Sequence, residues 1–121
     1  MLPPAFCLIV LASCVPTLGA ESPAARAALI LDRGLNLGNA LEAPREGSWG
    51  VTLEEKDFIL IRKAGFRSVR VPARWSAHAD PHPPYTIRPE FFQRVDWVLE
   101  QARQHGLSVV LNTHHWEDFH R

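Results

Sequence analysis

The sequence has few cysteines, no excess of either charge and no long apolar run. Its 121 residues contain only two cysteines, Cys7 and Cys14, so removal of residues 1–20 would leave no disulfide or thiol chemistry. The 13 Lys and Arg residues balance the 13 Asp and Glu residues, so no basic field is available to attract nucleic acid. No stretch reaches the roughly 18 apolar residues of a membrane span. Nucleic-acid binding and membrane insertion are therefore not expected.

The first twenty residues are typical of an export signal. Residues 5–12 read AFCLIVLA, and small or turn-forming residues follow up to Ala20, although no Lys or Arg precedes the apolar run. This pattern predicts a secretory signal peptide. Residues 11–14 also resemble a bacterial lipobox, in which Cys14 would carry a lipid anchor. We expect a signal peptide at residues 1–20, a folded domain at 21–121, and a secreted or periplasmic protein, with a lipoprotein as the alternative.

Three short apolar segments in the rest of the chain predict β-strands. They lie near Leu35, at residues 66–72 and at residues 107–112. The third segment is almost continuously apolar, which predicts a parallel strand covered on both faces.

Two segments between these strands predict helices. Residues 52–55 fit a capping box that would start a helix running to about residue 64, and Gly65 follows as a left-handed stop. The second helix is expected to begin at Pro89 and to end before Gly106, because apolar residues recur there at three- and four-residue steps. The resulting β-α-β-α-β order predicts an α/β fold with parallel strands.

This order fits either an open doubly wound sheet or the N-terminal part of a (β/α)8 barrel. No G-x-G-x-x-G follows the first strand, which disfavours a dinucleotide-binding sheet. Polar residues instead follow the strands: Asn39 and Glu42 after the first, Arg70 at the end of the second, and His114 and His115 after the third. Such placement is the rule in barrels, though open sheets share it. Asn39 and Glu42 could bind sugar hydroxyls or cap the first loop.

The polar residues allow several functions. Arg70 either positions a carboxylate in a site or pairs with a surface acid. His114, His115 and His120 could bind a polyhydroxyl ligand, belong to a solvated loop, or hold a metal in a metal-dependent hydrolase, although they lack the usual ligand spacing. Trp49 is a candidate substrate-binding residue, because a flat aromatic face suits a sugar ring. A non-catalytic carbohydrate-binding or interaction fragment is the alternative from a different class.

Three segments in order resemble glycoside hydrolase family 5, the cellulase family of barrel glycosidases. They read GLNLGNALE at residues 34–42, GFRSVRVPARW at 65–75 and LNTHH at 111–115. Each motif alone is weak, but the three at these spacings are specific, and the resemblance covers about residues 31–121. It implies a (β/α)8 TIM barrel and a secreted retaining endo-β-glycanase that hydrolyses β-1,4-glucan, with mannan or glucomannan as further substrates. The family uses no catalytic metal or cofactor.

The resemblance also implies roles for individual residues. Arg70 matches the arginine that hydrogen-bonds the nucleophilic glutamate of the family. His114 matches the histidine that lines the subsite at the scissile bond. Asn39, Glu42 and His115 are similar to substrate contacts farther from the cleavage point.

The sequence departs from the family pattern at the two catalytic carboxylates. The family's acid/base glutamate follows strand four and its nucleophile follows strand seven, whereas this sequence stops after the third expected strand. Glu117 is in the wrong place for either role. A complete barrel has about 250 residues. We therefore expect a fragment truncated after strand 3, without either catalytic glutamate and inactive on its own.

Overall fold

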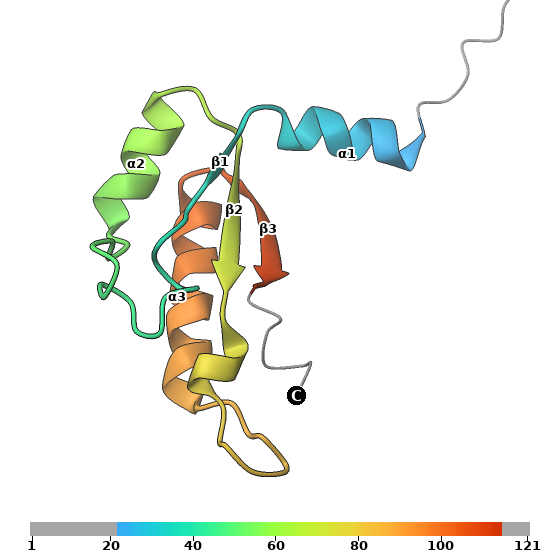
Figure 1. Ribbon diagram of the computed structural model, residues 1–121. Helices are drawn as coiled ribbons and strands as arrows, with labels where there is room; N and C mark the ends of the chain where they lie inside the picture. Colours follow the sequence, from blue (N-terminus) through green and yellow to red (C-terminus); the bar gives the residue numbers. More distant parts are fainter. Residues whose placement is uncertain (1–21, 115–121) are drawn as a thin grey trace, which may run out of the picture.

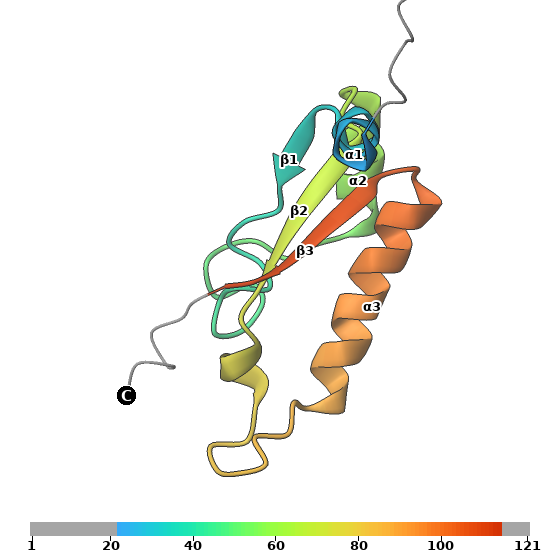
Figure 2. The same cartoon turned by 90° about the vertical axis from the view of Figure 1, so that its right-hand side faces the viewer.

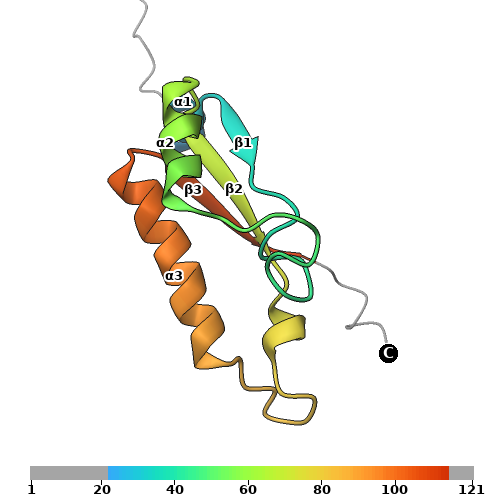
Figure 3. The same cartoon turned by 90° about the vertical axis from the view of Figure 1, so that its left-hand side faces the viewer.

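The computed structural model describes residues 22–114, which form a three-stranded parallel sheet with two helices against one face (Figure 1). Views from either side show α2 and α3 on the same side of the strands (Figures 2 and 3). The elements in order are α1 (Pro23–Leu31), β1 (Gly34–Asn36), α2 (Glu55–Lys63), β2 (Ser68–Ala73), the 3-10 helix η1 (Trp75–His78), α3 (Pro89–Gln104) and β3 (Ser108–Thr113). The predicted α/β fold is confirmed.

The strand order is β1-β2-β3. Both neighbouring pairs are parallel, as predicted. Asn36 lies opposite Arg70 in the first pair, and Arg70 lies opposite Val110 in the second. Because the strands run in the same direction, their carboxyl ends meet at one edge of the sheet, at the lower end in Figure 1. We call this the carboxyl edge. The loops after β1 and β2 leave the sheet there.

The helix-covered face of the sheet carries the hydrophobic core. Val69 and Val71 have no exposed surface, and they pack in one cluster with Phe58 of α2 and Val98 of α3. Arg70 lies between these valines on the opposite face, because side chains alternate along a strand. Arg70 is half-buried whereas both valines are fully buried, so the predicted alternation in this strand is confirmed.

Helix α2 begins later than the sequence predicts. Its capping box is formed by Glu54 and Asp57, and the Glu54 amide donates to Asp57 Oδ2 at 2.8 Å. The preceding residue, Leu53, does not extend the helix, because its carbonyl group accepts a hydrogen bond from outside the helix. The Leu53 amide donates to Glu46 Oε1 at 2.9 Å, and the Leu53 carbonyl accepts from Arg94 Nη2 at 2.6 Å. The predicted cap at residue 52 is wrong, and a long-range contact explains the difference.

Both predicted glycine stops have the backbone conformation that glycine favours. Gly65 has a φ of 88° after α2, and Gly106 has a φ of 68° after α3. In this left-handed region a side chain would be strained. The predicted ends of both helices are therefore confirmed.

Helix α1 was not expected from the sequence. Ser22 caps it by accepting a hydrogen bond from the Ala25 amide at 3.1 Å, and Pro23 occupies its first position. None of its residues is buried, and it extends away from the sheet (Figure 1). Within residues 22–114, no helix has both the length and the apolar character needed to cross a membrane.

Strand β3 is less covered than its apolar sequence predicts. Val110 and Leu111 are 41% and 40% exposed. Helix α3 packs against β3, but within the described part of the chain no strand pairs with its outer edge and no element covers the face opposite the helices. The prediction of a strand covered on both faces is therefore wrong for residues 22–114.

Candidate active site

Three of the residues singled out from the sequence lie in the strands or directly after them. Asn39 follows β1, Arg70 is the third residue of β2, and His114 follows β3. The prediction that Arg70 ends its strand is wrong, because β2 continues through Pro72 to Ala73. The half-buried His114 continues the strand pairing, because its amide donates to the Ala73 carbonyl at 2.9 Å. His115 lies outside the described residues.

Arg70 lies on the face of the sheet that the helices leave open, and the neighbouring strand holds its guanidinium. Arg70 Nη1 donates to Asn36 Oδ1 at 2.5 Å, between residues that are register partners. This bond uses one of the five donors of a guanidinium. The fork can therefore bind a carboxylate on the open face while Asn36 fixes its position. Sequence reasoning missed Asn36, and its position directly across from Arg70 in the strand register is the signal that identifies it.

Glu42 is buried, with 5% of its surface exposed, and it binds the backbone of its own loop. Its carboxylate accepts hydrogen bonds from the Asn39 amide and, at 3.0 Å, from the Ala40 amide. These bonds hold a turn in which Asn39 has a φ of 65°, a conformation that asparagine tolerates better than most residues. Glu42 thus shapes the loop, and Asn39 is the exposed member of the pair.

Trp49 lies in the loop between β1 and α2 and is 44% exposed. The loop closes beneath it through a hydrogen bond from the Gly47 amide to the Val51 carbonyl at 2.9 Å. Trp49 therefore presents part of its surface to solvent on this loop.

A half-buried ion pair fastens the same loop to α3. Arg94 Nε and Nη2 donate to the two carboxylate oxygens of Glu46 at 2.7 and 2.8 Å, and the Arg94 guanidinium also lies 4.2 Å from the ring centre of Trp97. Burial alone would raise the pKa of Glu46. The hydrogen bonds from Arg94 and from the Leu53 amide, together with the Arg94 charge, outweigh burial and lower this pKa below its usual value. The partners are 48 residues apart, so no local sequence pattern predicts this pair.

The structure describes only some of the residues in the metal hypothesis. Among residues 22–114, no three His, Cys, Asp or Glu side chains are grouped so as to hold a metal ion. Of the three histidines in that hypothesis, only His114 belongs to this range. His115 and His120 lie outside the described residues.

Sequence comparison relates most of the chain to one family. Residues 34–121 match the sequence model "Cellulase (glycosyl hydrolase family 5)". Endoglucanase H of Acetivibrio thermocellus is 43% identical over 82 residues, which cover 68% of this chain and 9% of that protein. Endoglucanase A of Ruminococcus albus is 36% identical over 93 residues, which cover 71% of this chain and 26% of that protein. The chain therefore spans only a small part of the length of either relative.

Solved structures give the same relationship. Thermotoga maritima Cel5A in complex with cellobiose is 52% identical, with a TM-score of 0.75 over 78% of this chain and 30% of that chain. The same enzyme in complex with mannotriose is 54% identical, with a TM-score of 0.72 over 74% of this chain and 29% of that chain. The three-stranded sheet and its helices thus correspond to the N-terminal portion of a (β/α)8 barrel, as predicted. The chain belongs to glycosyl hydrolase family 5, the cellulase family.

Proposed function

We propose that this chain is part of a secreted endo-β-1,4-glucanase that hydrolyses β-1,4-glucan with retention and also accepts mannan or glucomannan. The observation that carries the proposal is a parallel family 5 sheet in which Asn39 follows β1, Arg70 lies in β2 and His114 follows β3. The cellobiose and mannotriose complexes of a Thermotoga maritima enzyme that is over half identical support the choice of substrates.

In the proposed mechanism this chain supplies supporting residues to two carboxylates that family resemblance assigns to later strands. A retaining glycosidase places those two carboxyl groups about 5–5.5 Å apart, one as nucleophile and one as acid and then base. Arg70, oriented by Asn36, would bind the nucleophile and lower its pKa. No metal or cofactor is needed, because the carboxylates supply both the attacking oxygen and the proton.

The remaining residues would bind the sugar chain. His114 would line the subsite at the scissile bond, and His115 and the exposed Asn39 would contact neighbouring sugar units. Glu42 would act largely by fixing the loop that presents Asn39, because its carboxylate already accepts two backbone hydrogen bonds. The partly exposed Trp49 would stack on a sugar unit farther along the polysaccharide.

Export is the other part of the proposal. A signal peptide at residues 1–20 would deliver the enzyme to its polysaccharide outside the cell or in the periplasm, and a lipid at Cys14 would tether it instead. Mass spectrometry of the protein from an exporting host should find a mature N-terminus at Glu21 or a lipidated Cys14. Folded cytosolic protein that retains Met1 would contradict export.

The activity can be tested in a chimera, because the solved relative supplies the rest of the barrel. Residues 34–114 would replace the equivalent segment of Thermotoga maritima Cel5A. We expect the chimera to release reducing sugar from carboxymethylcellulose and from glucomannan. A chimera that melts cooperatively and binds cello-oligosaccharide without cleaving it would contradict the proposal and favour a carbohydrate-binding role.

A further inference from the structure

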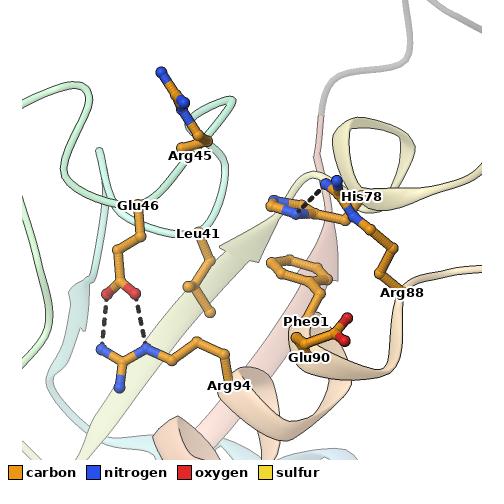
Figure 4. Close-up of a pocket in the computed structure, with 8 residues that line it drawn as sticks. All are labelled: Leu41, Arg45, Glu46, His78, Arg88, Glu90, Phe91 and Arg94. Atoms are coloured by element: carbon orange, nitrogen blue, oxygen red, sulfur yellow. Dashed lines mark hydrogen bonds and ion pairs between the residues drawn. The ribbon is translucent and has the colours of Figure 1, made fainter.

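The proposed reaction does not use a cavity of about 390 Å³. It lies at the carboxyl edge, between the loop after β1, the loop after β2 and the start of α3 (Figure 4). Asn39, Arg70 and His114 are not among the residues that line it. Its volume falls in the range of about 300–1,000 Å³ that is typical of small-ligand sites.

One wall of this cavity is a fixed aromatic stack. The rings of His78 and Phe91 lie parallel, with centres 3.8 Å apart and an angle of 6° between their planes. Trp75 packs edge-on against Phe91 at 5.2 Å, and Arg88 Nη2 lies 3.2 Å from His78 Nδ1, so neighbours hold both rings. Leu41 faces the stack from the loop after β1 (Figure 4). Leu41 and Phe91 expose only 2% and 6% of their surface, so the half-buried His78 ring is the part of this apolar lining that a ligand can reach.

The polar groups around the cavity carry both signs of charge. The Glu46–Arg94 pair lies at one end, while Arg45, Arg88 and Glu90 are exposed at its rim. A simple anion would meet two carboxylates, and a simple cation would meet three guanidinium groups. A hydroxyl group both donates and accepts hydrogen bonds, so a mixed set of donors and acceptors suits a neutral polyhydroxyl ligand.

We propose that this cavity is a second binding site for the β-linked polysaccharide, one that holds a pyranose unit against the half-buried His78 ring, which Phe91 supports from behind. The identity of the sugar rests on the proposed function. The hydroxyl groups of β-1,4-glucan project from the edges of each ring and leave its two faces apolar. A ring placed in this way would direct its hydroxyl groups toward the Glu46–Arg94 pair and toward the rim. Because the cavity lies at the carboxyl edge, the site would keep a long chain close to the edge where cleavage is proposed.

The direct test is a titration of the isotopically labelled 121-residue chain with cellohexaose, followed by NMR. We expect chemical-shift changes at the Leu41 methyl groups and at the His78 and Phe91 rings. Combining Arg45→Ala with Glu90→Gln should weaken binding by about tenfold, because two polar contacts are lost or weakened.

The matched control combines Arg26→Ala with Glu55→Gln, which changes an exposed arginine of α1 and an exposed glutamate of α2. These changes should leave cellohexaose binding as it is in the unmodified chain. Three results would overturn the inference: no shifts at the cavity, unchanged binding by the rim variant, or shifts there with sodium sulfate but not with cellohexaose.

A second measurement applies if the chain alone gives no dispersed spectrum. Calorimetry would titrate the Cel5A chimera with a thio-linked cello-oligosaccharide, which resists cleavage. The chimera should have one more binding site than the same chimera carrying Arg45→Ala and Glu90→Gln. An equal number of sites in both proteins would overturn the inference. If the chimera hydrolyses glucan but lacks the extra site, the proposed function stands and the second site is rejected. If the chimera has the extra site but does not hydrolyse glucan, sugar binding at the cavity stands and the proposed function is rejected.

Discussion

The two faces of the sheet differ in what covers them. The face covered by helices contributes to stability, whereas the open face carries the polar residues of the candidate site. On the helix-covered face, Val69 and Val71 are fully buried against α2 and α3. On the open face, Asn36 and Arg70 are hydrogen-bonded to each other beside Val110, which is 41% exposed. Apolar burial stabilises a fold by about 25 cal/mol per Å², whereas a guanidinium needs water or a carboxylate. The covered face thus holds the elements together, and the open face presents a charge.

The largest expected effect is a loss of stability when a buried side chain is removed from the covered face. Replacing Phe58, which has no exposed surface, by alanine should destabilise the Cel5A chimera by about 3–5 kcal/mol, because it removes buried contacts and leaves a cavity. Urea unfolding measures this loss.

Leu60→Ala is the matched control for that substitution. Leu60 lies on the same helix but is 60% exposed, so its removal should change stability far less. Equal losses for the two variants would show that the covered face is not what holds this segment together.

On the open face we expect activity, rather than stability, to change. Arg70→Ala should lower kcat/KM of the chimera by about 100-fold, or roughly 2.7 kcal/mol at 1.36 kcal/mol per decade. Without the guanidinium the pKa of the nucleophile should rise, so the acid limb of the pH–rate profile should move to higher pH. Steady-state kinetics across pH measure both effects.

Arg67→Ala controls for the loss of an arginine as such, because Arg67 is exposed and precedes β2 at the other end of the strand. It should retain the activity and the pH profile of the unmodified chimera. Wild-type turnover after Arg70→Ala would remove Arg70 from the proposed site.

A smaller effect is expected when the partner of Arg70 is changed. Asn36→Ala removes the amide oxygen that fixes the guanidinium, and a hydrogen bond to a charged group contributes about 1.5–3 kcal/mol. We expect kcat to fall roughly tenfold with little change in KM, and the acid limb to shift in the direction seen for Arg70→Ala. A rise in KM without a pH shift would instead indicate that Asn36 binds substrate.

The covered face and the succession of helices and strands could be predicted from the sequence because they depend on local periodicity. The spacing of apolar residues identified α3, the alternation around Arg70 identified β2, and Gly65 and Gly106 marked the ends of helices. These signals are contained within a few neighbouring residues.

Contacts between distant residues could not be predicted in this way. The Glu46–Arg94 pair joins a loop to a helix, moves the start of α2 and exists only once the chain has folded. The stack of His78 on Phe91 likewise depends on how the loop after β2 folds back onto α3. For the candidate site, the sequence identified Arg70, Asn39 and His114, whereas the contact with Asn36 required the strand register.

The smallest effects should distinguish two ion pairs, of which Glu46–Arg94 is half-buried and Glu100–Arg103 is exposed. Folding lowers the pKa of Glu46, so its stabilising effect is present above the unfolded pKa of about 4.5 and is lost as pH falls through the folded value. Glu46→Gln should therefore reduce stability by about 1 kcal/mol at pH 7 and flatten the loss of stability below about pH 4.5. Thermal melts at several pH values measure both changes.

Glu100 differs from Glu46 because its ion pair is exposed, although its pKa is lowered further. Its hydrogen bonds with Arg103 and Gln104 hold the pKa at about 2, yet the ion pair lies on the exposed side of α3. Water and salt screen such a pair, and ordering two long side chains offsets much of the attraction. Glu100→Gln should therefore leave the melting temperature at pH 7 nearly unchanged in 0.15 M salt. A loss as large as that of Glu46→Gln would show that charge pairing alone, without burial, fastens the loops and helices of this segment.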